Sequence, residues 1–306
     1  MYNHANPPQE AGSVDQQALD KAAVLAEALP YIREFSGKTV VIKYGGAAMA
    51  AADLKAAVMQ DIALMKYVGM HPIVVHGGGP EVSEMARRMG IEPRFVDGLR
   101  VTDAATMEIA QMVLIGKTNR EIVTQLCAQG VKAVGLSGQD AGLIRAVRHV
   151  HRSAGTGETV DLGFVGDVAA VDTGVLTALT AAGFVPVIAP IGVGPGGQAY
   201  NINADTVAGA IAAALKAEKL VLLTDVEGVR ADKDDPTSLV SRVTAQEVRA
   251  WIARGRVQGG MIPKLQCCLT ALEAGVNRVH IIDGRVPHSL LLEIFTDEGV
   301  GTMVVK

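Results

Sequence analysis

Two apolar segments that each end in glycines restrict the fold of this chain more than any other feature. Residues 39–46 form an apolar run that ends with Lys43, a tyrosine and two glycines. Residues 73–76 repeat the arrangement and continue into three glycines at 77–79. Such runs are typical of buried strands, and glycine lets the backbone approach a ligand closely. We therefore expect both strands to end at one shared anion-binding site.

Helical patterns separate the strands. Apolar residues recur at helical spacing over residues 51–68, and a further helix is expected over residues 80–89. Because strands that alternate with helices are joined by right-handed crossovers, this order predicts a parallel sheet. Residues 144–150 and 163–171 have the pattern of a strand hairpin, and their place between helices predicts a β-flap over a pocket. Residues 185–193, interrupted by Pro186 and Pro190, are expected to return to the main sheet.

A short hairpin is predicted around Asp97 and Gly98, where it displays Arg100. A long helix is expected over residues 103–128, with Thr102 or Asp103 as its N-terminal cap. The second half of the chain continues the α/β pattern. Its expected strands are 198–202, 220–225, 278–282 and 302–306, and its expected helices are 203–215, 244–254 and 261–274.

The N-terminal segment precedes the first core strand. Residues 18–35 have apolar residues at helical spacing, with Pro30 placed to kink the helix. The pattern alone leaves two interpretations open, namely assembly of several chains and coverage of the domain's own surface. The residues up to Gln17 are polar and lack the apolar centre of a signal peptide, so we expect a disordered tail.

The composition excludes several classes of protein. The 306 residues are 49% hydrophobic, which is enough for a sizeable core, and the length favours two lobes. With a net charge of −4, the chain has no global basic field that would attract nucleic acid. The uncharged stretch 173–204 is interrupted by glycines and prolines and cannot form a continuous membrane helix. Cys127, Cys267 and Cys268 form neither a disulfide framework nor a zinc motif, which favours reduced thiols in a cytoplasmic enzyme.

Familiar nucleotide and hydrolase motifs do not fit. A P-loop requires a glycine five positions before a Gly-Lys-Thr triplet, but Ile32 and Gln111 occupy those positions. Residues 192–197 match G-x-G-x-x-G formally, yet Pro195 and a strand-like segment follow where a helix should open. His76 and its glycines could form an esterase oxyanion loop, but the nearest G-x-S-x-G candidate ends in Gln139. Anion binding by backbone N–H groups remains the best interpretation.

Two lysines and one aspartate have the chemistry that phosphoryl transfer needs. Fixed cations and amide groups can stabilise charge on the transferring oxygens, and little covalent help is required. Lys43 ends the first strand, and Lys264 follows two glycines at a helix start. Asp205 could hold both lysines by charge while Asn201 grips a substrate. Isolated lysines more often face solvent, and Asn203 could simply cap a helix, but the glycine-rich settings favour function.

Five motifs together resemble those of the N-acetyl-L-glutamate kinase family, within the amino-acid kinase superfamily. They are Lys-Tyr-Gly-Gly-Ala-Ala-Met49, His-Gly-Gly-Gly79, Gly-Leu-Arg-Val-Thr102, Asn-Ile-Asn-Ala-Asp205 and Gly-Gly-Met-Ile-Pro-Lys264. The resemblance covers about residues 23–306 and implies an α/β fold, a three-layer αβα sandwich with a central, mainly parallel sheet. It also implies ATP-dependent phosphorylation of the γ-carboxylate of N-acetyl-L-glutamate, the second step of arginine biosynthesis. Mg²⁺ would be held mainly by the ATP phosphates.

The resemblance implies roles for individual residues. Lys43 and Lys264 would stabilise the transferring phosphoryl group, with Asp205 organising both. The implied substrate-binding residues are Gly78, Gly79, Arg100 and Asn201. The implied ATP-binding residues are Gly45, Gly46, Gly77, Thr224 and Asp225. The flap at 163–171 would cover the substrate.

Arginine-inhibited members of the family carry a similar N-terminal helix, which links dimers into a hexamer. Tyr31, His280, Glu293 and Gly299 match their arginine-site pattern, so the resemblance implies L-arginine as an inhibitor and a homo-oligomer. Residues 1–35 would be the tail and oligomerisation helix. Residues 36–195 would bind acetylglutamate and form the dimer, and residues 196–306 would bind ATP and arginine.

Two alternatives to this enzyme remain. One is a catalytically silent arginine-sensing paralogue on the same fold, and the other is a sister kinase that acts on free glutamate or aspartate. The intact set of Lys43, Asp205 and Lys264 favours an active kinase, because a silent sensor would not need all three.

Overall fold

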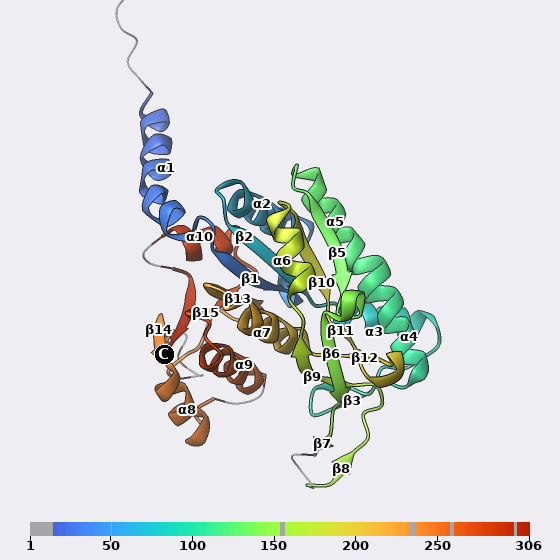
Figure 1. Ribbon diagram of the computed structural model, residues 1–306. Helices are drawn as coiled ribbons and strands as arrows, with labels where there is room; N and C mark the ends of the chain where they lie inside the picture. The colour runs from blue at the N-terminus through green and yellow to red at the C-terminus, as the bar shows by residue number, and fades with distance from the viewer. Residues whose placement is uncertain are drawn as a thin grey trace, which may run out of the picture.

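A sheet of eight strands forms the centre of the molecule (Figure 1). The computed structural model describes residues 15–49, 51–153, 157–232, 235, 237–257, 260–296 and 299–306. In spatial order the strands are β14 (Arg242–Thr244), β16 (Gly301–Val305), β15 (Arg278–Asp283), β13 (Lys219–Thr224), β1 (Thr39–Tyr44), β2 (His71–His76), β10 (Val185–Ala189) and β5 (Ala133–Ser137). Neighbouring strands are parallel except β15 and β16, which confirms the predicted mainly parallel sheet.

Helices cover both faces of this sheet, as the sequence predicts. Their bounds are α1 (Gln16–Phe35), α2 (Ala52–Tyr67), α3 (Gly79–Arg88), α4 (Ala104–Gln111), α5 (Asn119–Ala128), α6 (Gly174–Ala181), α7 (Ala204–Leu215), α8 (Ala245–Ala253), α9 (Met261–Glu273) and α10 (Ser289–Phe295). Figure 1 shows α7 and α9 on one side of the sheet, with α2 and α10 toward the other. The three-layer αβα arrangement is therefore confirmed.

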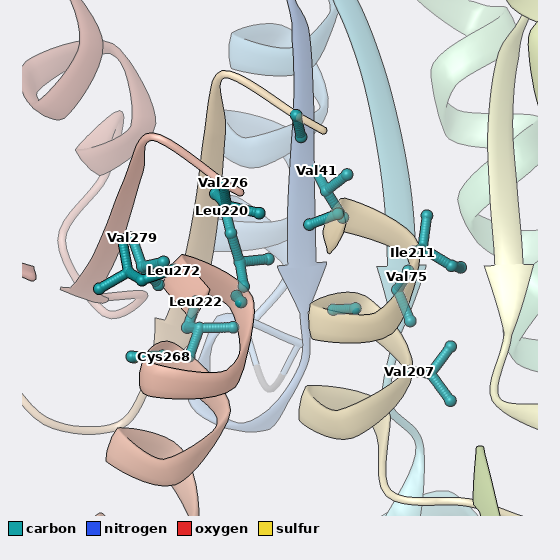
Figure 2. Close-up of a cluster of buried hydrophobic side chains, with 14 of the residues drawn as sticks. Val41, Val75, Val207, Ile211, Leu220, Leu222, Cys268, Leu272, Val276 and Val279 are labelled. Atoms are coloured by element: carbon teal, nitrogen blue, oxygen red, sulfur yellow. The ribbon is translucent and has the colours of Figure 1, made fainter. Parts of the chain in front are cut away.

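The side chains of the first strand, β1, are buried on both faces of the sheet. Val41 of β1 packs into a cluster with α7 and α9, whereas Val40 and Ile42 pack into a second cluster with α2, α5 and α10. Figure 2 shows the first cluster, in which Val207 and Ile211 of α7 lie against β1 and β2. Full burial of such a side chain contributes about 1.5–3 kcal/mol. A continuous apolar run is therefore what a strand buried on both faces requires.

A second, smaller sheet forms the predicted flap. Its order is β12 (Ala199–Asn201), β11 (Ile191–Val193), β6 (Ile144–Arg148) and β9 (Gly166–Val171). Strands β6 and β9 pair antiparallel, which confirms the predicted hairpin. A further short pair, β7 (His151–Arg152) with β8 (Thr159–Val160), extends the flap outward. The hairpin around Asp97 is also confirmed, as β3 (Phe95–Val96) and β4 (Leu99–Arg100).

The expectation that all of residues 185–193 return to the main sheet is wrong. Proline has no N–H group to donate, and the chain changes sheets at Pro190, so β10 stays in the main sheet while β11 joins the flap sheet. Pro190 O accepts a hydrogen bond from Ile202 N (3.0 Å), which helps to hold β12 beside β11. Residue 195, the expected lobe boundary, lies in the connection between β11 and β12, and the boundary itself stays a prediction.

The expected helix over residues 103–128 is interrupted by a π-helical segment, Met112–Thr118, between α4 and α5. Asp103 is its N-cap and accepts a hydrogen bond from Thr106 N, as expected. The missed elements include the short strands β7, β8 and β14 and the seven-residue helix α10, since all of them are too short for a clear period.

Helix α1 begins at Gln16 and runs through Pro30, and the rest of the predicted disordered tail lies outside the described residues. The predicted kink at Pro30 stays a prediction. In the part of the chain that the structure describes, no helix is both long and apolar enough to cross a membrane.

Candidate active site

Two lysines from different elements meet on one buried carboxylate. Lys43 extends from β1, Asp205 lies in the first turn of α7, and Lys264 lies in the first turn of α9. Lys43 Nζ is 3.2 Å from Asp205 Oδ1, and Lys264 Nζ donates a hydrogen bond to Asp205 Oδ2 (3.0 Å). The structure thus brings together the three predicted catalytic residues, which are separated by up to 221 positions from 43 to 264.

The two lysines decide the charge of Asp205. Burial acts to raise the pKa of this carboxyl group, but the two ammonium groups outweigh burial and leave the pKa below its usual value. Asp205 is therefore ionised at neutral pH. Its backbone is also fixed, because Asp205 N donates to Asn203 Oδ1 (2.8 Å) and the Cys267 thiol donates to Asp205 O (3.0 Å).

The glycines that follow β1 and β2 lie beside this cluster. Gly77 N donates to Tyr44 O (2.7 Å), which ties the two strand ends together. A Cβ atom on Gly45 would lie 3.1 Å from Lys43 Nζ, so the glycine leaves room for the ammonium group. Gly78, the N-cap of α3, has φ 153°, and a Cβ there would lie 2.5 Å from Leu114 Cδ2. Only glycine fits this turn without strain.

A buried histidine supports the glycine loop, and the sequence did not reveal its role. His76 Nδ1 donates to Gly77 O (2.7 Å), and His76 Nε2 accepts from Asn119 Nδ2 (3.2 Å). Burial lowers the pKa of His76 to about 4, so the ring is neutral at physiological pH. Asn119 also donates to Val187 O of β10 (2.9 Å). Hydrogen bonds that involve β2, α5 and β10 therefore hold the glycine loop in place.

One pocket, of about 220 Å³, contains the predicted substrate-binding residues and is called here the Arg100 pocket. Arg100 Nη2 donates to Gly79 O and to Ser83 Oγ, each at 2.7 Å, and the guanidinium group lies 4.7 Å from the centre of the Phe95 ring. Arg100 Nη1 is buried without a hydrogen-bond partner in the described part of the chain. The predicted residues in its lining are Gly77, Gly78, Gly79, Arg100 and Asn201.

A second pocket, of about 400 Å³, lies beyond Lys264 and is called the Asp225 pocket. Met261, one helical turn before Lys264, forms part of its wall. Ala204, next to Asp205, lines the Arg100 pocket, so each pocket has a wall residue close in sequence to the lysine cluster. Three arginines that the sequence reasoning did not single out also line the Asp225 pocket: Arg230, Arg256 and Arg285. The sequence offered little indication that these arginines line a pocket, because charged loop residues usually face solvent.

Thr224 does not reach the Asp225 pocket with its hydroxyl group. The Thr224 hydroxyl group donates to Val226 O (2.9 Å), and Ile282 O lies 3.3 Å from the same Oγ1 atom. The side chain is buried, so it shapes the turn after β13 rather than facing the pocket. Asp225, the next residue, does line the pocket.

The predicted arginine-site residues line a third pocket, of about 450 Å³, called the Glu293 pocket. Tyr31 comes from α1, His280 from β15, and Glu293 from α10, and Gly299 lies between α10 and β16. His280 Nδ1 donates to Glu293 Oε1 (2.5 Å), and Val300 N donates to Glu293 Oε2 (2.9 Å).

Lys219 also lines this pocket, and the sequence reasoning missed it. Its ammonium group lies 4.3 Å from the centre of the Phe35 ring. Burial, together with Arg278, lowers the pKa of Lys219 to about 8. A charged residue at the start of the apolar strand β13 was the signal that could have found it.

Comparison with known proteins identifies the family. The model of the amino acid kinase family matches residues 38–283. The chain belongs to the amino acid kinase family. Among curated proteins, the acetylglutamate kinase of Symbiobacterium thermophilum is 92% identical over 293 residues, which are 96% of this chain and 100% of that protein. The acetylglutamate kinase of Pelotomaculum thermopropionicum is 60% identical over 290 residues, 94% of this chain and 98% of that protein.

Solved structures of related proteins have a similar fold. N-acetylglutamate synthase from Neisseria gonorrhoeae, complexed with coenzyme A and N-acetyl-glutamate, has a TM-score of 0.80 and 30% identity. The match covers 93% of this chain and 63% of the synthase chain. Carbamate kinase from Giardia lamblia bound to AMP-PNP has a TM-score of 0.64 at 17% identity, covering 89% of this chain and 99% of that chain. At that identity the likeness establishes the fold alone.

Proposed function

We propose that the protein transfers the γ-phosphoryl group of ATP to the γ-carboxylate of N-acetyl-L-glutamate, giving N-acetyl-L-glutamyl 5-phosphate and ADP. The observation that carries this proposal is the Lys43–Asp205–Lys264 cluster, whose neighbours in sequence Ala204 and Met261 line the two pockets. The relatives that match nearly the whole chain at 56% to 92% identity, all acetylglutamate kinases by name, support the choice of substrate.

The acceptor would bind in the Arg100 pocket. Arg100 stays a cation, although burial lowers its pKa, and its Nη1 group is available for the α-carboxylate of acetylglutamate. Asn201 of β12 would hold the same end of the substrate, since it lines the same pocket as Arg100. Gly78 and Gly79 would supply backbone contacts at the start of α3, where N–H groups favour an anion.

The donor would bind in the Asp225 pocket, with its phosphates directed toward the lysines and toward Gly45, Gly46 and Gly77. An oxygen of the γ-carboxylate attacks the γ-phosphorus in line, and the bond from that phosphorus to the bridging oxygen breaks as ADP leaves. Charge on the transferring oxygens is stabilised by Lys43 and Lys264, whose positions are set before the reaction. A carboxylate nucleophile is already ionised, so no general base is required.

Mg²⁺ would accompany ATP and neutralise charge on its phosphates. We assign it to the nucleotide because both Asp205 oxygens already contact ammonium groups. Within the described residues, no group of three or more His, Cys, Asp or Glu side chains could hold a metal ion.

A direct assay tests the proposed reaction. The protein is incubated with ATP, Mg²⁺ and acetylglutamate in the presence of hydroxylamine, which traps the acyl phosphate as a hydroxamate. We expect hydroxamate formation that requires both substrates, with much lower rates on free glutamate and aspartate. Equal turnover of the free amino acids would favour a sister kinase. No hydroxamate from any substrate would favour a silent arginine-sensing paralogue.

We also propose that L-arginine inhibits the enzyme from the Glu293 pocket and that α1 links dimers into a hexamer. Helix α1 projects from the body of the molecule in Figure 1 and exposes Val24 and Leu25, the latter by 73%. Tyr31 brings the same helix into the pocket wall, so arginine binding and assembly would share an element. A cytoplasmic location is proposed from the three free cysteines.

Replacing Glu293 with glutamine is expected to weaken arginine inhibition at least about tenfold, because a carboxylate binds a guanidinium group much more strongly than an amide does. The arginine concentration that halves activity is measured for both proteins, with activity in the absence of arginine as the check on folding.

Deletion of residues 1–35 is the companion test. If the deletion changes neither the oligomer size nor the arginine response, the regulatory proposal is wrong.

A further inference from the structure

The outer end of the flap contacts the hairpin that carries Arg100. His151 Nε2 lies 2.8 Å from Asp97 Oδ2, and the His151 side chain is only 13% exposed. An ionised carboxylate can only accept hydrogen bonds, so His151 Nε2 carries the proton and donates it. His151 belongs to β7, and Asp97 lies in the turn between β3 and β4. Figure 1 shows β3 close to β7 at the lower end of the molecule.

The base of the flap is held by backbone hydrogen bonds. Thr102 N donates to Leu162 O (2.8 Å), and Phe164 N donates to Thr102 O (2.6 Å). Asn201 N donates to Phe164 O (2.9 Å) on the other side. The flap segment around Phe164 therefore runs between Thr102 and Asn201, and this part cannot swing away without breaking all three bonds.

The Arg100 hairpin has much less backbone support. Its strands β3 and β4 contain two residues each, and isolated hairpins of this size are at most marginally stable. At its inner end Arg100 contacts Gly79 O and Ser83 Oγ. At its outer end the turn at Asp97 contacts His151. The side-chain contacts at both ends therefore set where the guanidinium group lies.

Other charged pairs on the flap do not make this connection. His149 Nδ1 lies 2.9 Å from Asp167, within the β6–β9 pair, and Arg148 pairs with Asp161 on the same flap at 2.6 Å. Both of these pairs are internal to the flap. Exposed ion pairs such as Arg148–Asp161 contribute little to stability. The His151–Asp97 pair differs because it is largely buried on one side and joins two separate elements.

We propose that the His151–Asp97 pair fixes the closed flap onto the Arg100 hairpin and so positions Arg100 for the acceptor's α-carboxylate. This inference rests on the proposed function of the Arg100 pocket. Neither residue touches the reacting atoms, so both are positioning residues. Their loss affects binding of the acceptor, not the phosphoryl transfer step or ATP.

Kinetics of the full-length His151→Ala variant test this. We expect its KM for acetylglutamate to rise about three- to fivefold, the size expected when one hydrogen bond is lost, while kcat and the KM for ATP stay within about twofold. Arg148→Ala removes an exposed pair from the same flap and is the matched control, with all three constants unchanged. A His151→Ala KM equal to that of the parent overturns the inference. Absence of any acetylglutamate turnover in the parent protein overturns the proposed function and the inference together.

Variants of Asp97 distinguish the effect of losing the hydrogen bond to His151 from the effect of changing the turn conformation. Asp97 has φ 49°, a conformation that asparagine and glycine accept. Asp97→Asn keeps a hydrogen-bond acceptor and is expected to retain most of the affinity, whereas Asp97→Gly removes it and should match His151→Ala. In the double variant His151→Ala with Asp97→Gly, the KM should rise no further than in either single variant. Additive effects in the double variant would show that the two residues act independently, contrary to the inference.

Discussion

Replacing Lys43 with methionine is expected to lower kcat by on the order of 10²–10³-fold, the usual loss when one preorganised electrostatic contact to the transition state is removed. Lys43 Nζ is held 3.2 Å from Asp205 Oδ1 and lies beside the glycines that follow β1 and β2. The charge that it stabilises is larger in the transition state than in bound ATP. The effect should therefore appear in kcat more than in the KM for ATP.

The Lys43→Met variant should remain folded. Methionine matches the aliphatic part of lysine, and Asp205 keeps Lys264 as a partner, so no buried carboxylate is left without a counter-charge. Lys38→Met is the matched control, because it makes the same chemical change at an exposed position just before β1. Kinetics and thermal unfolding are measured on both. A Lys43→Met enzyme with a parental kcat would remove Lys43 from the proposed mechanism.

The sequence anticipated the active site where short motifs contain the chemistry. Lys43 and Lys264 each lie within a few residues of two glycines at an element end, and this context distinguishes them from ordinary surface lysines. The sheet was predictable for a similar reason, since a run such as that of β1 fits only a strand buried on both faces.

Features that depend on tertiary contacts were not predictable. The sequence allowed residues 185–193 to stay in the main sheet, because a proline is tolerated in an edge strand. The change of sheets at Pro190 is seen only in the structure, where β11 pairs with β12. The π-helical segment before Asn119 has the same apolar spacing as an α-helix. The contact between Asp97 and His151 joins residues 54 positions apart, and no local pattern relates them.

The charge of Asp205 leads to the second large effect. In Asp205→Asn, the ammonium groups of Lys43 and Lys264 would share a buried site without a counter-charge, which costs about 3 kcal/mol or more when a buried ion pair is broken. Both lysines would move apart, so we expect kcat to fall by about 10²-fold or more as well. This variant therefore loses stability and activity together, whereas Lys43→Met loses mainly activity.

The pH dependence of the free energy of unfolding distinguishes the effect of the Asp205 charge from the effect of its packing. The pKa of Asp205 is lowered in the folded protein, so its stabilising contribution is present above the unfolded-state value and is lost as the pH falls through the folded-state value. The stability difference between the parent and Asp205→Asn should thus be largest near neutral pH and narrow in acid. Asp53→Asn, at an exposed first-turn position of α2, is the control and should change stability by only a few tenths of a kcal/mol. A difference that stays constant down to low pH would mean that Asp205 acts through packing and not as the carboxylate that holds the two lysines.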